Sequence, residues 1–137
     1  MAEEIGNVFP LTLLRDRLLP HLFKEDLSEI TYWAGKDLAR EIELHGINAI
    51  IEFFADAGFG TLSIQTQKAT MQKWTLSGKI ITTRLTESDN PDFSLEAGFI
   101  AQQTQQQIGF GAEAQIEIGK NNVNFIILTE AAGILAD

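Results

Sequence analysis

The sequence contains no cysteine. Without a thiol the chain forms no disulfide, and thiolate nucleophiles, iron–sulfur ligation, cysteine-based zinc sites and thioester-linked lipids are all excluded. Histidine is also scarce, since only His21 and His45 occur and neither has a companion at the spacing of a metal site. We therefore expect surface or capping roles for both histidines, and we expect neither a metal ion nor a cofactor.

The chain also has few basic residues and no long apolar run. The chain has 10 Lys and Arg against 19 Asp and Glu, which gives a net charge of −9. This charge repels phosphate backbones and anionic lipid surfaces, so nucleic acid and membrane surfaces are not expected partners. No apolar run approaches the roughly 18 residues of a membrane span. The acidic start MAEEIGN is unlike a signal peptide, and we expect a cytoplasmic protein.

Apolar residues are plentiful enough to build a real core. Of the 137 residues, 45% are hydrophobic and 9% are aromatic, which suits a domain that folds without a disulfide or a metal. No internal repeat, linker or change of composition divides the chain. The sequence therefore predicts a single domain over residues 1–137.

Helical periodicity fills the first half of the chain. Three helices are predicted over residues 11–23, 26–41 and 47–58. Pro20 lacks an N–H group and restricts the residue before it, so the first helix should kink or stop there. Gly58 is well placed as the left-handed C-cap of the third helix.

Apolar stripes indicate which helix faces should be buried. In the first helix leucines recur at i, i+3, i+7 and i+11, whereas Arg15, Asp16 and Arg17 should turn away. The third helix is apolar over more than half its circumference and should be buried on more than one side. The expected inner residues are Leu11, Leu14, Leu18 and Leu22 of the first helix and Ile30, Ala34 and Leu38 of the second.

Period-two alternation after Gly60 predicts strands, and a second alternating pair near the C-terminus predicts a hairpin. Helices, then strands, then a helix and a hairpin indicate an α+β domain. We expect the N-terminal helices and one later helix to pack against a twisted, mainly antiparallel sheet of about four to five strands. The strands are expected over residues 61–66, 72–78, 79–85, 112–118 and 123–129.

The later helix is predicted from Ser94 to Ile108 and contains five glutamines within residues 102–107. Wound at 100° per residue, its first two turns are apolar on two faces, because Leu95 and Phe99 lie opposite a stripe of small residues. We therefore expect its N-terminal half to lie between two layers. Its glutamines should cover the solvated face of its C-terminal half, and any pocket should lie beside the N-terminal half.

No catalytic motif is present. The chain lacks a phosphate-binding loop, a complete dinucleotide fingerprint, a G-x-S-x-G elbow and an H-E-x-x-H metal motif. Glu96 and Glu113 could form a carboxylate pair, although a charge on a helix surface and a charge on a strand face explain them more simply. We therefore do not expect an enzyme.

Aromatic bulk is the remaining feature that could serve a function. Two interpretations stay open. The aromatic residues form a closed core, or the helices and the sheet leave an apolar cavity for a hydrophobic ligand. The expected lining of such a cavity is Trp33, Phe53, Phe54, Trp74 and Phe99.

Several segments occur in an order that resembles the YslB-like family of Gram-positive bacterial proteins of unknown function. These segments are LLRDRLLPHLF, ITYWAGKDLARE, IIEFFADAGFGTL, WTLSG and FSLEAGFIAQQTQQQIGFGAEAQIEI. The family is similar to vinyl-reductase-type small-molecule-binding domains and, more distantly, to the Bet-three-type subunits of the TRAPP vesicle-tethering complex. The most specific positions are Tyr32, Gly35, Gly58, Gly60, Glu96, Gly98 and Glu113.

The resemblance covers roughly residues 9 to 128 and leaves residues 1–8 and 129–137 as expected tails. It implies an α+β domain that is usually paired into homodimers and, in the wider group, an apolar pocket that holds a hydrophobic small molecule or an acyl chain. Members of that wider group typically carry cysteines in the late hairpin region, whereas this chain has none. The resemblance therefore implies noncovalent burial of a ligand, without metal binding or covalent lipidation.

The matched glycines have physical explanations. Gly35 and Gly98 should let their helices approach neighbours closely, and Gly58 with Gly60 should turn a helix into a strand. The first functional hypothesis is a noncatalytic, homodimeric domain that holds an apolar ligand between helices and sheet. The alternative is a homodimeric protein-interaction scaffold with a closed core and no ligand.

Overall fold

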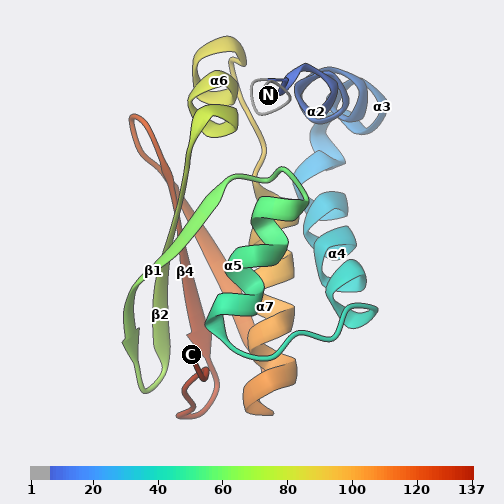
Figure 1. Cartoon of the computed structure of the whole chain (residues 1–137). Helices are drawn as coiled ribbons and strands as arrows, with labels where there is room; N and C mark the ends of the chain where they lie inside the picture. Colours follow the sequence, from blue (N-terminus) through green and yellow to red (C-terminus); the bar gives the residue numbers. More distant parts are fainter. Residues whose placement is uncertain (1–6) are drawn as a thin grey trace.

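The computed structural model describes residues 7–137, which form helices packed on one side of a four-stranded sheet (Figure 1). This arrangement confirms the α+β class. Residues 1–6 of the expected N-terminal tail lie outside the described part. The helical elements are α2 (Phe9–Leu13), a π-helical turn η1 (Leu14–Leu18), α3 (Leu19–Phe23), a 3-10 turn η2 (Lys24–Asp26), α4 (Leu27–Arg40), α5 (Ile47–Asp56), α6 (Lys79–Glu87) and α7 (Ser94–Ile108).

The sheet consists of two hairpins joined edge to edge. Its strand order is β1-β2-β4-β3, and every neighbouring pair is antiparallel. The β1–β2 register shifts between Ile64 and Thr66, which marks a bulge near the middle of β1. β1 and β3 are therefore the two edge strands. The strands are β1 (Thr61–Lys68), β2 (Met71–Ser77), β3 (Ala112–Ile118) and β4 (Val123–Thr129).

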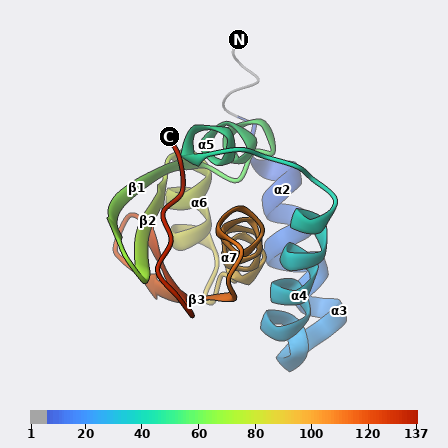
Figure 2. The same cartoon turned by 90° about the horizontal axis from the view of Figure 1, so that it is seen from below.

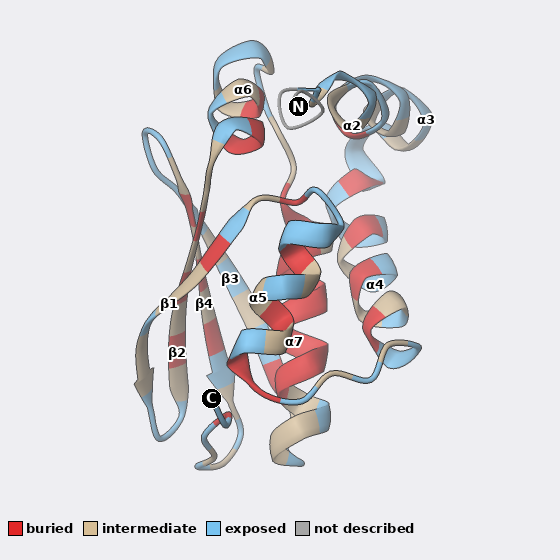
Figure 3. Cartoon of the chain, in the orientation of Figure 1, coloured by how far each residue is buried: buried red, intermediate tan, exposed pale blue. Residues whose placement is uncertain are grey.

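Helix α7 is the centre of the fold. Seen along its axis, it is surrounded by the sheet, by α5 and by α4 with the N-terminal helix (Figure 2). Its residues are buried almost without interruption from Ser94 to Thr104, after which the helix emerges (Figure 3). The expectation that its N-terminal half lies between two layers is confirmed. Its last turn ends at Gly109, whose φ of 86° closes the helix in the left-handed conformation.

The N-terminal helix continues through Pro20 instead of stopping there. The backbone widens into the π turn η1 just before the proline, and the N–H of Leu19 bonds the carbonyl of Leu14, five residues back. A widened turn removes the ring's clash with a carbonyl four residues earlier. The helix ends at Lys24, which has a φ of 51°.

The predicted buried stripes of the first two helices are largely wrong, although Leu11 is half-buried against the core. Arg15 is buried in the N-terminal helix, whereas Leu14, Leu18 and Leu22 are exposed. The inner face of α4 is displaced by one position from the prediction, because its contact with α7 selects small residues for close approach. That inner face consists of Leu27, Thr31, Gly35 and Ala39, while Ile30 and Ala34 are exposed and Leu38 is half-buried.

The predicted strand over residues 79–85 is helix α6 instead. Its β-branched residues favour a strand by composition. Ile80, Ile81 and Arg84 nevertheless have helical spacing, and all three point inward and are buried. Gly78, with a φ of 107°, ends β2 and precedes the helix, and its carbonyl accepts the first hydrogen bonds of α6.

The segment after β4 is docked rather than being a tail. Leu135 is buried, and the side chain of Gln67 bonds both its N–H and its carbonyl. The N–H of Ile47 at the start of α5 donates to the carbonyl of Ala136 at 2.7 Å. The prediction of a tail over residues 129–137 is therefore wrong, because this segment joins the sheet side of the fold to α5.

Candidate functional site

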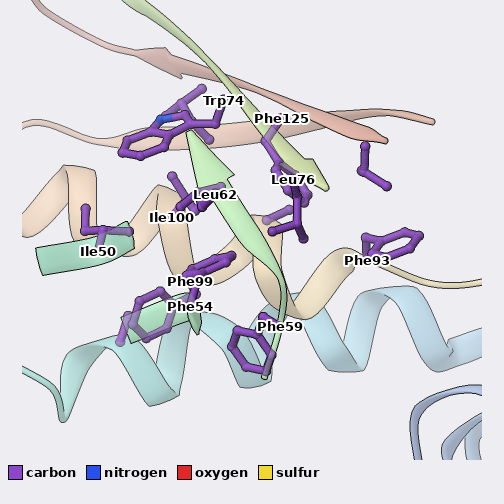
Figure 4. Close-up of a cluster of buried hydrophobic side chains, with 14 of the residues drawn as sticks. Ile50, Phe54, Phe59, Leu62, Trp74, Leu76, Phe93, Phe99, Ile100 and Phe125 are labelled. Carbon is purple, nitrogen blue, oxygen red and sulfur yellow. The ribbon is translucent and has the colours of Figure 1, made fainter. Parts of the chain in front are cut away.

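Phenylalanine rings from α5, α7 and the turn after α5 pack together (Figure 4). Phe53 stacks on Phe99 with a centroid separation of 4.6 Å and an interplanar angle of 2°. Phe54 meets Phe99 edge to face at 5.9 Å and Phe59 at 5.3 Å. Phe54 and Phe99 have no exposed surface, whereas Phe53 is half-buried. The structure thus brings together three of the five predicted ligand-binding residues.

Trp74 lies elsewhere in the same core, on the inner face of β2. It is fully buried, and its indole N–H donates to Oε1 of Gln72 at 2.8 Å. Thr104 of α7 donates to the same oxygen. The amide nitrogen of Gln72 is buried and has no hydrogen-bond partner among the described residues. Trp74 therefore supports the sheet side of α7, and the phenylalanine stack lies on another side of that helix.

Trp33 is apart from both groups. Its side chain is 58% exposed on the outer face of α4, and the guanidinium of Arg40 lies 5.9 Å from its ring centroid. The prediction that Trp33 lies in the interior with the other aromatic residues is therefore wrong. Trp33 is two residues from both Thr31 and Gly35, which places it on the side of α4 opposite the inner face. The sequence pattern alone did not reveal which face is the inner one.

An ion pair between Arg15 and Glu96 ties the N-terminal helix to the start of α7. Both guanidinium nitrogens contact the carboxylate at 2.8 Å, and exposures are 5% and 0%. Burial by itself would lower the pKa of Arg15, but the charge of Glu96 and its hydrogen bonds outweigh this effect, and the pKa is raised. Glu96 thus serves as a structural anchor for a buried cation.

Arg84 of α6 joins the same network. It donates to both carboxylate oxygens of Asp16 at 3.0–3.1 Å and to the carbonyl of Asp92 at 2.7 Å. Its guanidinium lies 4.3 Å from the ring centroid of Phe93, and a second contact reaches Glu96 at 3.6 Å. Three helices are therefore connected by charges shielded from water.

Asp92 organises the loop between α6 and α7. Its carboxylate accepts hydrogen bonds from Ser28 and Thr31 of α4 at 2.7 and 2.6 Å and from the hydroxyl of Ser94 at 2.8 Å. Burial would raise the pKa of Asp92, but these donors favour the charged form and the pKa is lowered. The prediction that Arg15 and Asp16 turn away from the core is wrong. No role was predicted for Arg84 or Asp92, because no local pattern pairs residues so distant in sequence.

Tyr32 and Glu113 meet at the surface between α4 and β3. The phenol donates to Glu113 at 2.5 Å and accepts the N–H of Ala114 at 3.0 Å, while Lys36 contacts the same carboxylate at 3.0 Å. Burial and the hydrogen bond to Glu113 raise the pKa of Tyr32. Burial would raise the pKa of Glu113, but the bonds from Tyr32 and Lys36 lower it. Glu96 and Glu113 are thus bonded to different partners, one buried and one exposed.

The matched glycines lie at close helix contacts or at backbone positions with positive φ. A Cβ atom on Gly35 would overlap the carbonyl oxygen of Leu95, and one on Gly98 would overlap that of Tyr32. The predicted close helix approach is confirmed. Gly58 and Gly60 have φ values of 77° and 138° between α5 and β1, which confirms the predicted turn.

The glutamines of α7 are structural, and the prediction of a solvated face is wrong for the first two. Gln103 is fully buried and donates to the carbonyls of Ala39 and Ile42 at the end of α4. Gln107 accepts the N–H of Gly46 before α5. Gln102 is buried as well, and Gln106 is the one glutamine of the run that is exposed. The run therefore satisfies backbone groups that the end of α4 and the start of α5 leave unpaired.

A surface groove of about 600 Å³ borders these glutamines. Its lining includes Arg40, His45, Gln106 and Ile134. His45 is exposed, and its Nε2 lies 3.1 Å from the carboxylate of Glu43. Among residues 7–137, no group of three or more His, Asp and Glu side chains is arranged to hold a metal ion, and no described helix is long and apolar enough to span a membrane.

Two solved structures share this fold. A vinyl-4-reductase family protein from Methanocaldococcus jannaschii matches with a TM-score of 0.53 and 18% identity over 94% of this chain and 82% of its own. The phenol-responsive sensory domain of the transcription activator PoxR, solved with phenol, matches with a TM-score of 0.58 and 11% identity over 89% of this chain and 74% of its own. These likenesses establish the fold; the likeness to TRAPP subunits stays a prediction.

Sequence comparison identifies nearer relatives. An uncharacterized protein, YslB of Bacillus subtilis (strain 168), is 37% identical over 123 residues, which cover 90% of this chain and 82% of the relative. A family model described as a protein of unknown function (DUF2507) matches residues 8–129. The family match includes the buried network, the phenylalanine stack and the glycine contact, and the chain therefore belongs to the DUF2507 family.

Proposed function

We propose that this domain binds a small apolar molecule, with an aromatic ring as the best-suited group, between α5 and α7 and without converting it. The carrying observation is the parallel stack of half-buried Phe53 on fully buried Phe99 at 4.6 Å. A planar ligand of similar size would make the same contact with Phe99 after Phe53 swings away. Phe53 then fills the site in the ligand-free chain.

The neighbourhood of α5 supports such a displacement. This ten-residue helix lies between Gly46, with a φ of 89°, and Gly58, with a φ of 77°. The start of α5 is held by the bonds of Gly46 and Ile47 to Gln107 and Ala136. Glycine tolerates large backbone rotations, so α5 can act as a cover that is hinged at this held end and opens at the Gly58 end. Its outward movement would separate Phe53 from Phe99 and leave α7 held by the sheet and α4.

The proposed absence of catalysis follows from the chemistry of the cluster. The rings are surrounded by apolar residues such as Ile50 and Ile100, which supply no acid, base or nucleophile. The phenol bound by the sensory domain of PoxR is consistent with an aromatic ligand on this fold. The cytoplasm stays the predicted location.

Phenol is the first probe. We expect phenol to shift the NMR signals of the Phe53 and Phe99 rings in the wild-type protein. Phe99→Leu keeps apolar volume but removes the stacking partner, and it should weaken phenol binding about tenfold. Phe53→Leu should bind phenol at least as well as wild type, because it removes only the displaced ring.

Phe110→Leu is the matched control, since this ring is 44% exposed and lies outside the stack; it should change nothing. Native mass spectrometry of protein purified from cells should also show an apolar adduct. The proposal is wrong if purified protein is repeatedly empty and millimolar phenol moves neither ring signal.

A specific observation favours the homodimeric scaffold as a second function. Four large apolar side chains lie exposed along the N-terminal helix at i, i+4, i+9 and i+13, and the extra residue of the π turn keeps them on one side. Exposed apolar rows of this kind mark association surfaces. They are Phe9, Leu13, Leu18 and Leu22, with exposures of 64%, 45%, 48% and 59%.

Light scattering after size-exclusion chromatography tests this scaffold. We expect wild type to run as a dimer and Leu18→Lys as a folded monomer. Ile134→Lys, at an apolar residue that is 68% exposed elsewhere, should leave the dimer intact. A wild-type chain that stays monomeric at high concentration would exclude this function but not phenol binding.

A further inference from the structure

Edge strand β3 has backbone groups that point away from the sheet. Odd-numbered residues of β3 bond to β4, because Glu130 donates to the carbonyl of Gly111 and Gly119 donates to that of Asn122 in the same alternating ladder. The N–H of Ala114 points to the free edge, where Tyr32 accepts it. By the same alternation, Ile116 and Ile118 direct their backbone groups to that edge.

A groove runs along this edge, between β3 and the first turns of α4. It consists of two adjoining hollows of about 410 and about 370 Å³, which share Ser28, Ser94 and Ile116 in their linings. Ile116 is half-buried in the groove, and Ile118 at its end is 53% exposed. Apolar side chains and free backbone groups therefore lie side by side along it.

The groove is acidic. Its lining contains four carboxylates and a single lysine, Lys24. Glu113 is 70% exposed at one end, where Lys36 pairs with it, and Glu25 and Glu29 are exposed on the α4 side and supply the acidic character. The four carboxylates are Glu25, Glu29, Asp92 and Glu113.

We propose that this groove binds an extended, basic peptide segment of another protein, which adds a strand to β3. Its backbone pairs with Ile116 and Ile118, its apolar side chains cover these isoleucines, and its Lys or Arg residues meet the carboxylates of the rim. Strand addition takes affinity from the backbone and selectivity from alternate side chains.

The charges of this chain disfavour a second copy at the edge. Twofold antiparallel pairing about Gln115 would set Glu113 of one copy opposite Glu117 of the other, and like charges directly opposite destabilise a strand pair. Each copy also carries a net charge of −9. Charge complementarity therefore favours a basic partner.

Tyr32 limits how far such a strand can extend. Its hydroxyl accepts the N–H of Ala114 at 3.0 Å, which is the bond that a partner carbonyl would make. Tyr32→Phe frees this donor and lets the added strand lengthen by one pair. The same contact protects the unoccupied edge from unspecific pairing.

Amide NMR with acetyl-KVKVKVKVK-amide as the probe tests the proposal. We expect this peptide to shift the amide signals of Ile116 and Ile118 at concentrations up to ~1 mM in low salt. The matching Glu–Val peptide should bind at least about tenfold more weakly. A Lys–Val peptide that is N-methylated at every residue, and therefore has no N–H on either edge, should not bind.

Two protein variants complete the test. Ile116→Pro removes an edge-facing N–H without touching the β3–β4 ladder and should reduce binding about tenfold, whereas Ile116→Val should retain it. Tyr32→Phe should strengthen binding. Signals that shift elsewhere, no shift at ~1 mM peptide, or equal binding of the N-methylated or Glu–Val peptide would overturn the proposal.

Discussion

Gly35 of α4 and Gly98 of α7 each lie against the backbone of the other helix. A Cβ atom on Gly35 would overlap the carbonyl of Leu95, and one on Gly98 would overlap the carbonyl of Tyr32. The two helices therefore touch through their backbones over this stretch. The contact also fixes the side of α4 that carries Tyr32 and the side of α7 that carries Phe99.

Gly35→Ala should destabilise the protein although alanine is the better helix former. At an uncrowded helix position this change would stabilise by up to about 1 kcal/mol. Here the methyl group forces α4 and α7 apart, and we expect a loss of about 3 kcal/mol. Urea denaturation measures it. Ala34→Gly at the exposed neighbouring position is the control and should cost about 1 kcal/mol; a stabilised Gly35→Ala variant would contradict the close approach.

Glu96→Gln should be strongly destabilising because it leaves Arg15 as a buried charge without its counterion. Breaking a buried pair from one side costs about 3–5 kcal/mol. The double variant Arg15→Met/Glu96→Leu should recover most of that loss. Lys36→Met breaks a pair whose carboxylate is 70% exposed, and it should cost less than about 1 kcal/mol. Chemical denaturation of the four proteins gives the comparison, and equal costs for Glu96→Gln and Lys36→Met would refute it.

Tyr32 should resist ionisation in the folded protein. Because its pKa is raised on folding, its stabilising effect is fully present below the unfolded pKa of about 10 and is lost as the pH rises above that value. The chain has one tyrosine, so phenolate absorbance reports this residue alone. We expect the absorbance to appear well above pH ~10 in buffer and near pH ~10 in urea. Glu113→Gln should lower the pKa of Tyr32 in the folded protein, but only in part, because burial remains. If Tyr32 of the folded wild type titrates at its unfolded pKa, the contact with Glu113 is disproved.

Phe99→Ala and Trp33→Ala should have very different costs. Phe99 is fully enclosed, and its removal should cost about 3–5 kcal/mol. Trp33 is 58% exposed, so its removal should cost under about 1 kcal/mol. Thermal unfolding of both variants is the measurement. A small cost at Phe99 would mean that the ring borders open space instead of filling the core.

The strands and the turns were predictable because their signals are local. Alternation at period two located β1 around Leu62 and β2 around Trp74, and GKNN located the last hairpin. Gly58 and Gly60 were recognisable because few other residues adopt positive φ. The aromatic grouping was partly predictable, since Phe53, Phe54 and Phe99 come from helices that are apolar on several sides.

Burial within the helices was less predictable. The stripe of Leu14, Leu18 and Leu22 has helical spacing, but the π turn and the pairing of Arg15 with Glu96 turn those leucines outward. Helix α6 was mistaken for a strand because β-branched residues outweighed the inward spacing that ends at Arg84. The buried polar network had no local signal at all.

The sequence by itself determined the α+β class, the absence of thiol chemistry, the acidic surface and most element boundaries, because these depend on composition and short-range periodicity. Only the tertiary structure decided which faces are buried, since that depends on partners far along the chain. Arg15 became a core residue because Glu96 lies opposite it. Trp33 became a surface residue because Gly35, two residues further on, faces α7. Gln103 became buried because α4 ends beside it.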